Sequence, residues 1–226
     1  MASIICLDFD DTIVLENTAR LLFDRFAAPS WREFESEYHA GRLTVEQYNA
    51  AAFATIEASR EEMTAFVSAS VTVRPGFLEL VDWATWHDWL PIVVSNGFDL
   101  YVDTVLDGLG LDRVARHAGR TRREYRWQAL YYSPRGIVLE DAFKLSYAAA
   151  FRSAGDFVAY VGDGASDVEA ARLAPAVFAR DTLLRRLAGA HPRLFPFETF
   201  HDIIAVLDRE SEAWLASFSS TTAAAD

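Results

Sequence analysis

Three apolar runs along the chain have the length of buried strands: residues 3–9, 91–94 and 157–161. Short apolar runs bounded by turn residues are typical of strands buried on both faces. Segments with helical periodicity separate the runs, which predicts a parallel sheet covered by helices. The carboxyl ends of parallel strands share one edge of a sheet, where ligands bind. Each run leads into a cluster of small or polar residues at that edge, namely Asp8–Thr12, Ser95–Gly97 and Gly162–Asp167.

Residues 16–72 interrupt this alternation of strands and helices. The region carries helical patterns near residues 14–28, 31–40, 44–58 and 60–69. Thr44 and Gln47 have the spacing of a capping box, which marks the start of the third of these helices. We therefore predict an α/β core formed by residues 1–15 and 73–226, with residues 16–72 inserted as a small α-helical cap.

Two later regions depart from the strand and helix pattern. Residues 121–139 alternate in polarity and contain the turn sequence Ser133–Gly136, which predicts a β-hairpin. Its aromatic side chains suit cross-strand packing better than base stacking in such an acidic chain. These side chains are Tyr125, Trp127, Tyr131 and Tyr132. A last helix is expected near 200–214, and the small, polar residues 219–226 are expected to form a disordered tail.

Composition and charge narrow the class of protein. The 226 residues are 51% hydrophobic and 24% charged, with a formal net charge of −12. This is a globular composition, and the negative charge argues against nucleic-acid binding. A single cysteine, Cys6, excludes an intrachain disulfide and fits a reducing compartment. We see no secretory signal or membrane-spanning stretch, so we expect a cytoplasmic protein without membrane partners, as a monomer or a dimer.

The first polar cluster crowds negative charge at the end of a buried strand. Asp8, Asp10 and Asp11 fall within four positions, where their carboxylates repel one another and lose solvation. A Mg²⁺ ion would relieve this repulsion, because it prefers oxygen ligands and is commonly held by one or two carboxylates. Asp8 and the distant Asp163 are the candidates to hold it.

The same residues suit phosphoryl transfer. A carboxylate at a strand end can attack phosphorus to form an aspartyl phosphate, and a second carboxylate two positions later can act as general acid and base. The phosphate oxygens need donors, which Ser95, Asn96 and Lys144 can supply. Lys144 is the only lysine of the chain, since every other basic residue is arginine or histidine. A compact ammonium beside a phosphate is a specific requirement, so we expect Lys144 to be a site residue.

Four motifs in this order resemble those of the haloacid dehalogenase-like superfamily. Asp8-Phe9-Asp10-Asp11-Thr12 matches its Asp-x-Asp-x-Thr signature, Ser95 its second motif and Lys144 its third. Gly162–Asp167 is similar to the fourth. A helical insertion between the first two motifs is what phosphoserine phosphatase and its relatives carry. The resemblance therefore implies a Rossmann-like parallel sheet core with an inserted helical cap.

A closer resemblance is to the methionine-salvage phosphatases that act on a phosphorylated methylthio-ketopentenyl enol. It is carried by Trp31–Tyr48, Val94–Asp99, Val177–Asp181 and Pro196–Phe200. The second motif reads Ser-Asn-Gly where these relatives usually have Ser-Gly-Gly, so Asn96 either adds an amide contact or narrows the site. The hairpin region matches poorly, which leaves the substrate open between such an enol phosphate and a phosphoserine-like compound.

The resemblance implies a Mg²⁺-dependent phosphatase for a small phosphorylated metabolite. The implied catalytic residues are Asp8 as nucleophile, Asp10 as general acid and base, and Lys144. Ser95, Asn96 and Lys144 would bind the phosphate, and Asp8, Asp10 and Asp163 would bind the metal. Thr12, Gly164 and Asp167 would support the site, with Asp167 orienting Lys144 or a metal-bound water. A phosphomutase that shares the aspartyl phosphate and a non-catalytic phospho-ligand-binding protein are the alternatives.

Several further polar residues have simpler interpretations. For Asp11, a site role and a solvated charge at a helix start are equally good readings. Solvated or packing roles are expected for four residues in or near the helical insertion, namely Glu16, Arg20, Trp31 and Arg42. The histidines lack metal-binding spacing, and Cys6 is expected to pack in the core.

Overall fold

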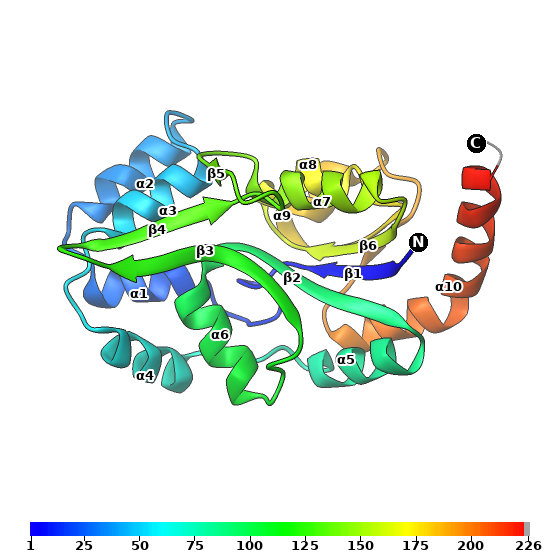
Figure 1. The fold of residues 1–226 in the computed structure, drawn as a ribbon, viewed down its shortest axis with the longest axis horizontal. Coiled ribbons are helices and arrows are strands. Elements are labelled where there is room, and N and C mark those ends of the chain that lie inside the picture. Colours follow the sequence, from blue (N-terminus) through cyan, green and yellow to red (C-terminus); the bar gives the residue numbers. More distant parts are fainter. Residues whose placement is uncertain (224–226) are drawn as a thin grey trace.

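A computed structural model describes residues 1–223 and shows an α/β fold built on a twisted sheet (Figure 1). Within these residues eight strands form a sheet of order β5-β4-β3-β2-β1-β6-β7-β8. The strands are β1 (Ser3–Leu7), β2 (Trp89–Phe98), β3 (Ala115–Arg123), β4 (Trp127–Tyr132), β5 (Val138–Leu139), β6 (Phe157–Gly162), β7 (Ala176–Ala179) and β8 (Leu194–Pro196). The strands β3, β2, β1, β6, β7 and β8 pair parallel in this order, whereas β4 pairs antiparallel with β3 and with β5. The predicted α/β class with a mostly parallel sheet is confirmed.

Helices cover both faces of this sheet. They are α1 (Thr18–Phe26), α2 (Trp31–His39), α3 (Val45–Phe53), α4 (Arg60–Ser70), α5 (Phe77–Trp86), α6 (Asp99–Gly108), α7 (Phe143–Ser153), α8 (Val168–Ala171), α9 (Asp181–Leu187) and α10 (Phe200–Ala223). Because side chains alternate along a strand, Ile5 and Leu7 of β1 join the core under α5, α6 and α10. Ile4 and Cys6 face the opposite core under α7, α8 and α9. The central strand is thus buried on both sides, which fixes the position of its carboxyl end.

The helical segment 16–72 contains α1–α4 and is joined to the sheet by two links that lie side by side. Val14 and Val73 form an antiparallel bridge there. The Leu15 amide donates to the Thr72 carbonyl at 2.9 Å. The segment contributes side chains of α1, α3 and α4 to the larger core, and α3 packs on β4 and β2. The capping box expected at Thr44 is present at the start of α3.

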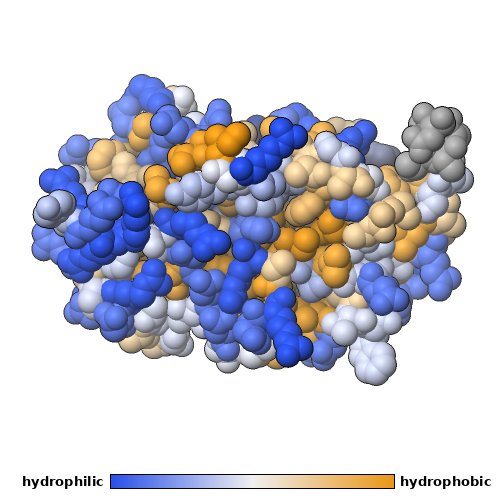
Figure 2. All heavy atoms as spheres, viewed as in Figure 1, coloured by the Kyte–Doolittle hydropathy of each residue, from blue (hydrophilic) through white to orange (hydrophobic). Residues whose placement is uncertain are grey.

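In the region 115–139, β-strands cover more residues than the sequence predicts. The predicted hairpin starts at residue 121, but β3 already starts at Ala115, because its first half pairs with β2 and its second half with β4. A second reversal at residues 133–136 leads into β5 at the edge of the sheet. Ile137 and Val138 are exposed there, and Figure 2 shows apolar atoms on the surface near β5.

The end of the chain corrects one expectation. Helix α10 was expected to end near residue 214 but continues to Ala223, into the segment predicted as a disordered tail, and residues 224–226 of that tail lie outside the described part. The cause is aromatic packing, since the rings of Trp214 and Phe218 both lie against Phe157 of β6 and extend the helix past its expected end. No helix within residues 1–223 is long and apolar enough to span a membrane.

Candidate active site

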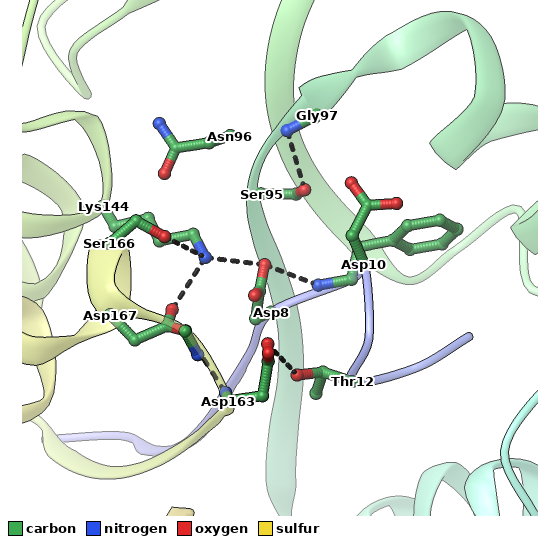
Figure 3. A network of polar contacts seen from close by, with 12 residues as sticks. Asp8, Asp10, Thr12, Ser95, Asn96, Gly97, Lys144, Asp163, Ser166 and Asp167 are labelled. Carbon is green, nitrogen blue, oxygen red and sulfur yellow. Dashed lines mark hydrogen bonds and ion pairs between the residues drawn. The ribbon is translucent and has the colours of Figure 1, made fainter. Parts of the chain in front are cut away.

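A buried ion pair lies where β1 meets α7. Asp8 directly follows β1, and its amide donates to the Val161 carbonyl of neighbouring β6 at 2.9 Å. Lys144 lies in the first turn of α7, and its Nζ is 2.7 Å from Asp8 Oδ1 and 2.7 Å from Asp167 Oδ1 (Figure 3). All three side chains are buried. The structure therefore brings together three of the predicted residues from three separate segments of the chain.

Asp167 is fixed by donors on both of its oxygens. The Tyr160 hydroxyl donates to Oδ1 at 2.7 Å, and the Gly164 amide donates to Oδ2 at 2.8 Å. Gly162 leaves room for this carboxylate, because a Cβ at position 162 would lie 2.7 Å from Asp167 Cγ. With its oxygens occupied in this way, Asp167 is placed to hold the Lys144 ammonium.

The charges around Lys144 do not balance. Burial lowers the pKa of Lys144, but the carboxylates of Asp167 and Asp8 outweigh it and raise that pKa above its usual value. Burial and the Asp167 charge raise the pKa of Asp8, against the effect of Lys144. Burial and the same Asp167 charge raise the pKa of Asp163 to about 7. One ammonium thus faces three carboxylates, and a further cation would be stabilised beside them.

The carboxylates could hold a metal ion through oxygen atoms. Among residues 1–223, Asp8, Asp163 and Asp167 each offer a ligand atom within 4.8 Å of the others. Since Asp167 is already engaged by Lys144, the free oxygens of Asp8 and Asp163 fit a hard cation best. Asp10, which was expected among the metal ligands, is not in this group, because its carboxylate is bound elsewhere.

The side chain of Asp10 is held on both of its oxygens. The Thr18 amide at the start of α1 donates to Oδ1 at 2.8 Å, and the buried Tyr101 hydroxyl donates to Oδ2 at 2.5 Å. Burial raises the pKa of Asp10 to about 6, although the hydrogen bonds from Tyr101 and Thr18 lower it. A carboxyl with a pKa near neutrality can both give and take a proton, as the general acid and base role requires.

The end of β2 supplies polar groups opposite Asp8. Ser95 is buried, and its Oγ accepts a hydrogen bond from the Gly97 amide at 2.9 Å. Asn96 is also buried, and its carbonyl accepts hydrogen bonds from Asn49 and Tyr131. Ser95, Asn96 and Lys144 line the same cavity as Asp8, so one ligand could contact all four residues.

The loop after Asp10 is held from several directions. Thr12 is buried and donates to Asp163 Oδ1 at 3.2 Å. The buried Arg74 donates to the carbonyl oxygens of Thr12 at 2.7 Å and Asp11 at 2.6 Å. Asp11 has a φ of 58°, a strained left-handed conformation for a residue with a Cβ. Arg74 thus supports a loop whose conformation is unfavourable by itself, a role that its sequence context did not indicate.

The cavity above Asp8 has a volume of about 250 Å³ and is closed partly by the helical segment. Arg20 lines it, whereas Glu16, Trp31 and Arg42 do not, in agreement with their simpler interpretations. Glu16 accepts a hydrogen bond from the Thr72 amide, Trp31 packs in the core, and the exposed Arg42 pairs with Glu37. Further lining residues from this segment were not predicted, namely Glu35, Tyr38, His39, Tyr48 and Asn49.

This arrangement agrees with the comparison to protein families. The model of the haloacid dehalogenase-like hydrolases matches residues 5–172. The chain belongs to this family. The resemblance seen in the four motifs and the expectation of a hydrolase are confirmed, and Asp8, Ser95, Lys144 and Asp163 all fall within the matched range.

Relatives within the haloacid dehalogenase-like hydrolases are similar over nearly the whole chain. A protein of Bacillus velezensis named 2-hydroxy-3-keto-5-methylthiopentenyl-1-phosphate phosphatase is 27% identical over 218 residues, covering 94% of this chain and 93% of the relative. The bifunctional enzyme MtnB/MtnX of Bacillus licheniformis is 31% identical over 94% of this chain, which spans only 51% of that protein. A solved phospho-aspartyl intermediate analogue of phosphoserine phosphatase superposes with a TM-score of 0.66 at 20% identity, covering 90% of this chain and 98% of that one. The structural likeness confirms the fold.

Proposed function

We propose that the chain is a Mg²⁺-dependent phosphatase that hydrolyses a small phosphorylated metabolite through an aspartyl phosphate on Asp8. The observation that carries the proposal is the buried contact between Asp8 and Lys144 at 2.7 Å, on the floor of a cavity that Asp10 also lines. A carboxylate and an ammonium in contact at a cavity floor present a nucleophile beside a group that can bind a phosphoryl oxygen.

The two half-reactions follow from the positions of the carboxylates. An oxygen of Asp8 forms a bond to phosphorus while the ester P–O bond breaks, and Asp10 gives its proton to the leaving oxygen. Water then attacks the phosphorus of the acyl phosphate and gives a proton to Asp10, while the bond between the Asp8 oxygen and phosphorus breaks. This step releases inorganic phosphate and restores the Asp8 carboxylate. The hydrogen bonds from Thr18 and Tyr101 keep Asp10 in place for both proton transfers.

Positive and neutral donors hold the phosphoryl oxygens during these steps. The ammonium of Lys144 and the hydroxyl of Ser95 lie beside the Asp8 carboxylate, in the lining of the same cavity (Figure 3). Asp167 keeps Lys144 charged and fixed, so the donor needs little reorganisation when substrate binds. Asn96, which borders the same cavity, is the further donor that we assign to the phosphate.

The carboxylate pair of Asp8 and Asp163 would hold the metal ion. Bound Mg²⁺ would supply charge that offsets the substrate phosphate and the crowded carboxylates. Thr12 orients Asp163 through its hydrogen bond, and Gly164 orients Asp167. These are the supporting roles that we assign to the first and fourth motifs.

Residues 16–72 act as a cap in this proposal. Side chains of the segment complete the wall of a cavity of about 250 Å³, which suits a small metabolite rather than a phosphoprotein or a nucleic acid. The names of the Bacillus relatives support a methylthiopentenyl-type enol phosphate as the first substrate to test. Phosphoserine is the second, because phosphoserine phosphatases share the fold.

The test is a panel of phosphorylated metabolites incubated with the full chain and Mg²⁺. Release of inorganic phosphate from a small ester supports the proposal, and an isomerised sugar phosphate without net release would indicate a phosphomutase instead. Absence of turnover on every ester, together with binding of one of them, would favour a phospho-ligand-binding protein.

A further inference from the structure

Glu46 is a buried carboxylate of the helical segment that no step of the proposed reaction uses. It lies in the first turn of α3 and is only 3% exposed. Its Oε1 accepts a hydrogen bond from Asn96 Nδ2 at 2.9 Å and another from the Phe143 amide at 3.0 Å. One oxygen atom therefore binds two segments of the core that are 47 residues apart in sequence.

Both of these partners are next to residues that we assign to phosphate binding. Asn96 follows Ser95 at the end of β2, and Phe143 precedes Lys144 at the start of α7. Glu46 thus links the two elements that carry the Ser95 hydroxyl and the Lys144 ammonium.

Helix α7 has no cap of its own. The residue at its N-cap is Ala142, which has a φ of 55° and no side-chain oxygen to accept from the first turn. The first amides of a helix need an external acceptor, and a negative charge is favourable there. Glu46 supplies this acceptor from another part of the chain, so the start of α7 is capped only when α3 is in place.

Neighbouring contacts hold α3 in the same position. Asn49, one turn after Glu46, donates to the Asn96 carbonyl at 2.7 Å, and the Tyr131 hydroxyl donates to the same carbonyl at 2.5 Å. At the outer edge of the interface, Gln47 donates to the Glu140 carboxylate at 3.3 Å. The interface between α3 and the core is therefore polar, and its buried part lies directly beside the phosphate-binding residues.

We propose that Glu46 is a positioning residue that sets the phosphate-binding elements when α3 docks. It joins the Asn96 side chain to the first turn of α7, and so couples the closed arrangement of residues 16–72 to the alignment of Ser95 and Lys144. The inference rests on the proposed function, because it concerns the site that binds the phosphoryl group.

The test compares Glu46→Ala, Glu46→Gln and the wild-type chain with Mg²⁺. Two readouts are needed: hydrolysis of p-nitrophenyl phosphate and binding of orthovanadate as a phosphate analogue. The alanine variant should lower kcat/KM and weaken orthovanadate binding by about tenfold to a hundredfold, the effect of losing hydrogen bonds to a charged group. The glutamine variant should stay within about threefold of wild type, because its amide oxygen can accept from both donors.

Glu140→Ala is the matched control, since it removes a contact of the same interface that does not reach Asn96 or Phe143. It should leave both readouts unchanged, and thermal unfolding of each variant separates lost stability from lost alignment. If Glu46→Ala does not fold, Glu46→Asp replaces it, because the shorter side chain should fail where glutamine succeeds.

The outcomes separate the inference from the proposed function. Wild-type levels of hydrolysis and orthovanadate binding in Glu46→Ala would overturn the role of Glu46 and leave the phosphatase proposal standing. Equal losses in the glutamine and alanine variants would also overturn it, since the accepting oxygen would then not be the important feature. A wild-type chain that neither hydrolyses the ester nor binds orthovanadate would overturn both.

Discussion

The hydroxyl of Tyr101 donates a hydrogen bond of 2.5 Å to Asp10 Oδ2. Tyr101 lies in α6 and is fully buried, and a glycine at position 97 makes the contact possible. A Cβ at that position would lie 1.9 Å from the Tyr101 hydroxyl oxygen. The orientation of the proposed general acid therefore depends on two residues outside its own motif.

Removing the Tyr101 hydroxyl should impair the proton transfers without disturbing the fold. We expect Tyr101→Phe to lower kcat by about tenfold to a hundredfold, within the range that a general acid and base contributes. Steady-state kinetics on a small phosphate ester measure this, with Tyr125→Phe as the control because Tyr125 is fully exposed. Wild-type kcat in Tyr101→Phe would show that the hydrogen bond does not position Asp10.

A methyl group at position 97 should have a similar effect by displacing Tyr101. We expect Gly97→Ala to lose at least as much activity as Tyr101→Phe and to destabilise the fold by about 1–3 kcal/mol through overpacking. Gly108→Ala is the control, since no atom lies within 4 Å of its added Cβ. Activity and urea unfolding of both variants check the prediction, which fails if Gly97→Ala behaves like Gly108→Ala.

Loss of the single lysine should affect stability and activity together. Lys144→Gln leaves the buried carboxylates of Asp8 and Asp167 without their cation, which should cost about 3–5 kcal/mol of unfolding free energy. Turnover should fall by about a hundredfold to a thousandfold, as for loss of one preorganised donor at a developing charge. Arg172→Gln breaks only an exposed ion pair with Glu169 and should change neither quantity. Retained stability and activity in Lys144→Gln would contradict the assignment of this ion pair.

Metal dependence can be tested by activity and by binding. Chelation should abolish turnover, added Mg²⁺ should restore it, and Mg²⁺ should raise the melting temperature of the wild-type chain. Asp163→Asn should require more Mg²⁺ for both effects, whereas Asp82→Asn, an exposed carboxylate away from the cavity, should not. Full activity in excess chelator would exclude the metal from the reaction.

The site residues at the strand ends could be predicted because each lies close to an apolar run in the sequence itself. Asp8, Ser95 and Asp163 each come at or directly after the end of an apolar run, and parallel pairing brings those ends together. The same logic could not give the length of β3, because its second half is specified by pairing with β4 rather than by its own sequence.

Residues that act through tertiary contacts could not be recognised in the same way. In the sequence, Tyr101 looks like one of several apolar positions of a helix. Glu46 looks like an ordinary acidic residue in the first turn of a different helix. Their roles depend on which helix packs against the strand ends, which is decided by contacts between segments far apart in sequence. Nor could the sequence show that Thr18 and Tyr101 hold the carboxylate of Asp10 apart from those of Asp8 and Asp163.

The most direct test of the account is to search for the phosphoryl group on Asp8. The wild-type chain is mixed with a phosphorus-labelled substrate and Mg²⁺, quenched in acid within the first turnover, digested and mapped by mass spectrometry. The account predicts label on the peptide that contains Asp8, and neither label nor turnover in Asp8→Asn. Turnover in Asp8→Asn, or label on a different residue, would contradict it.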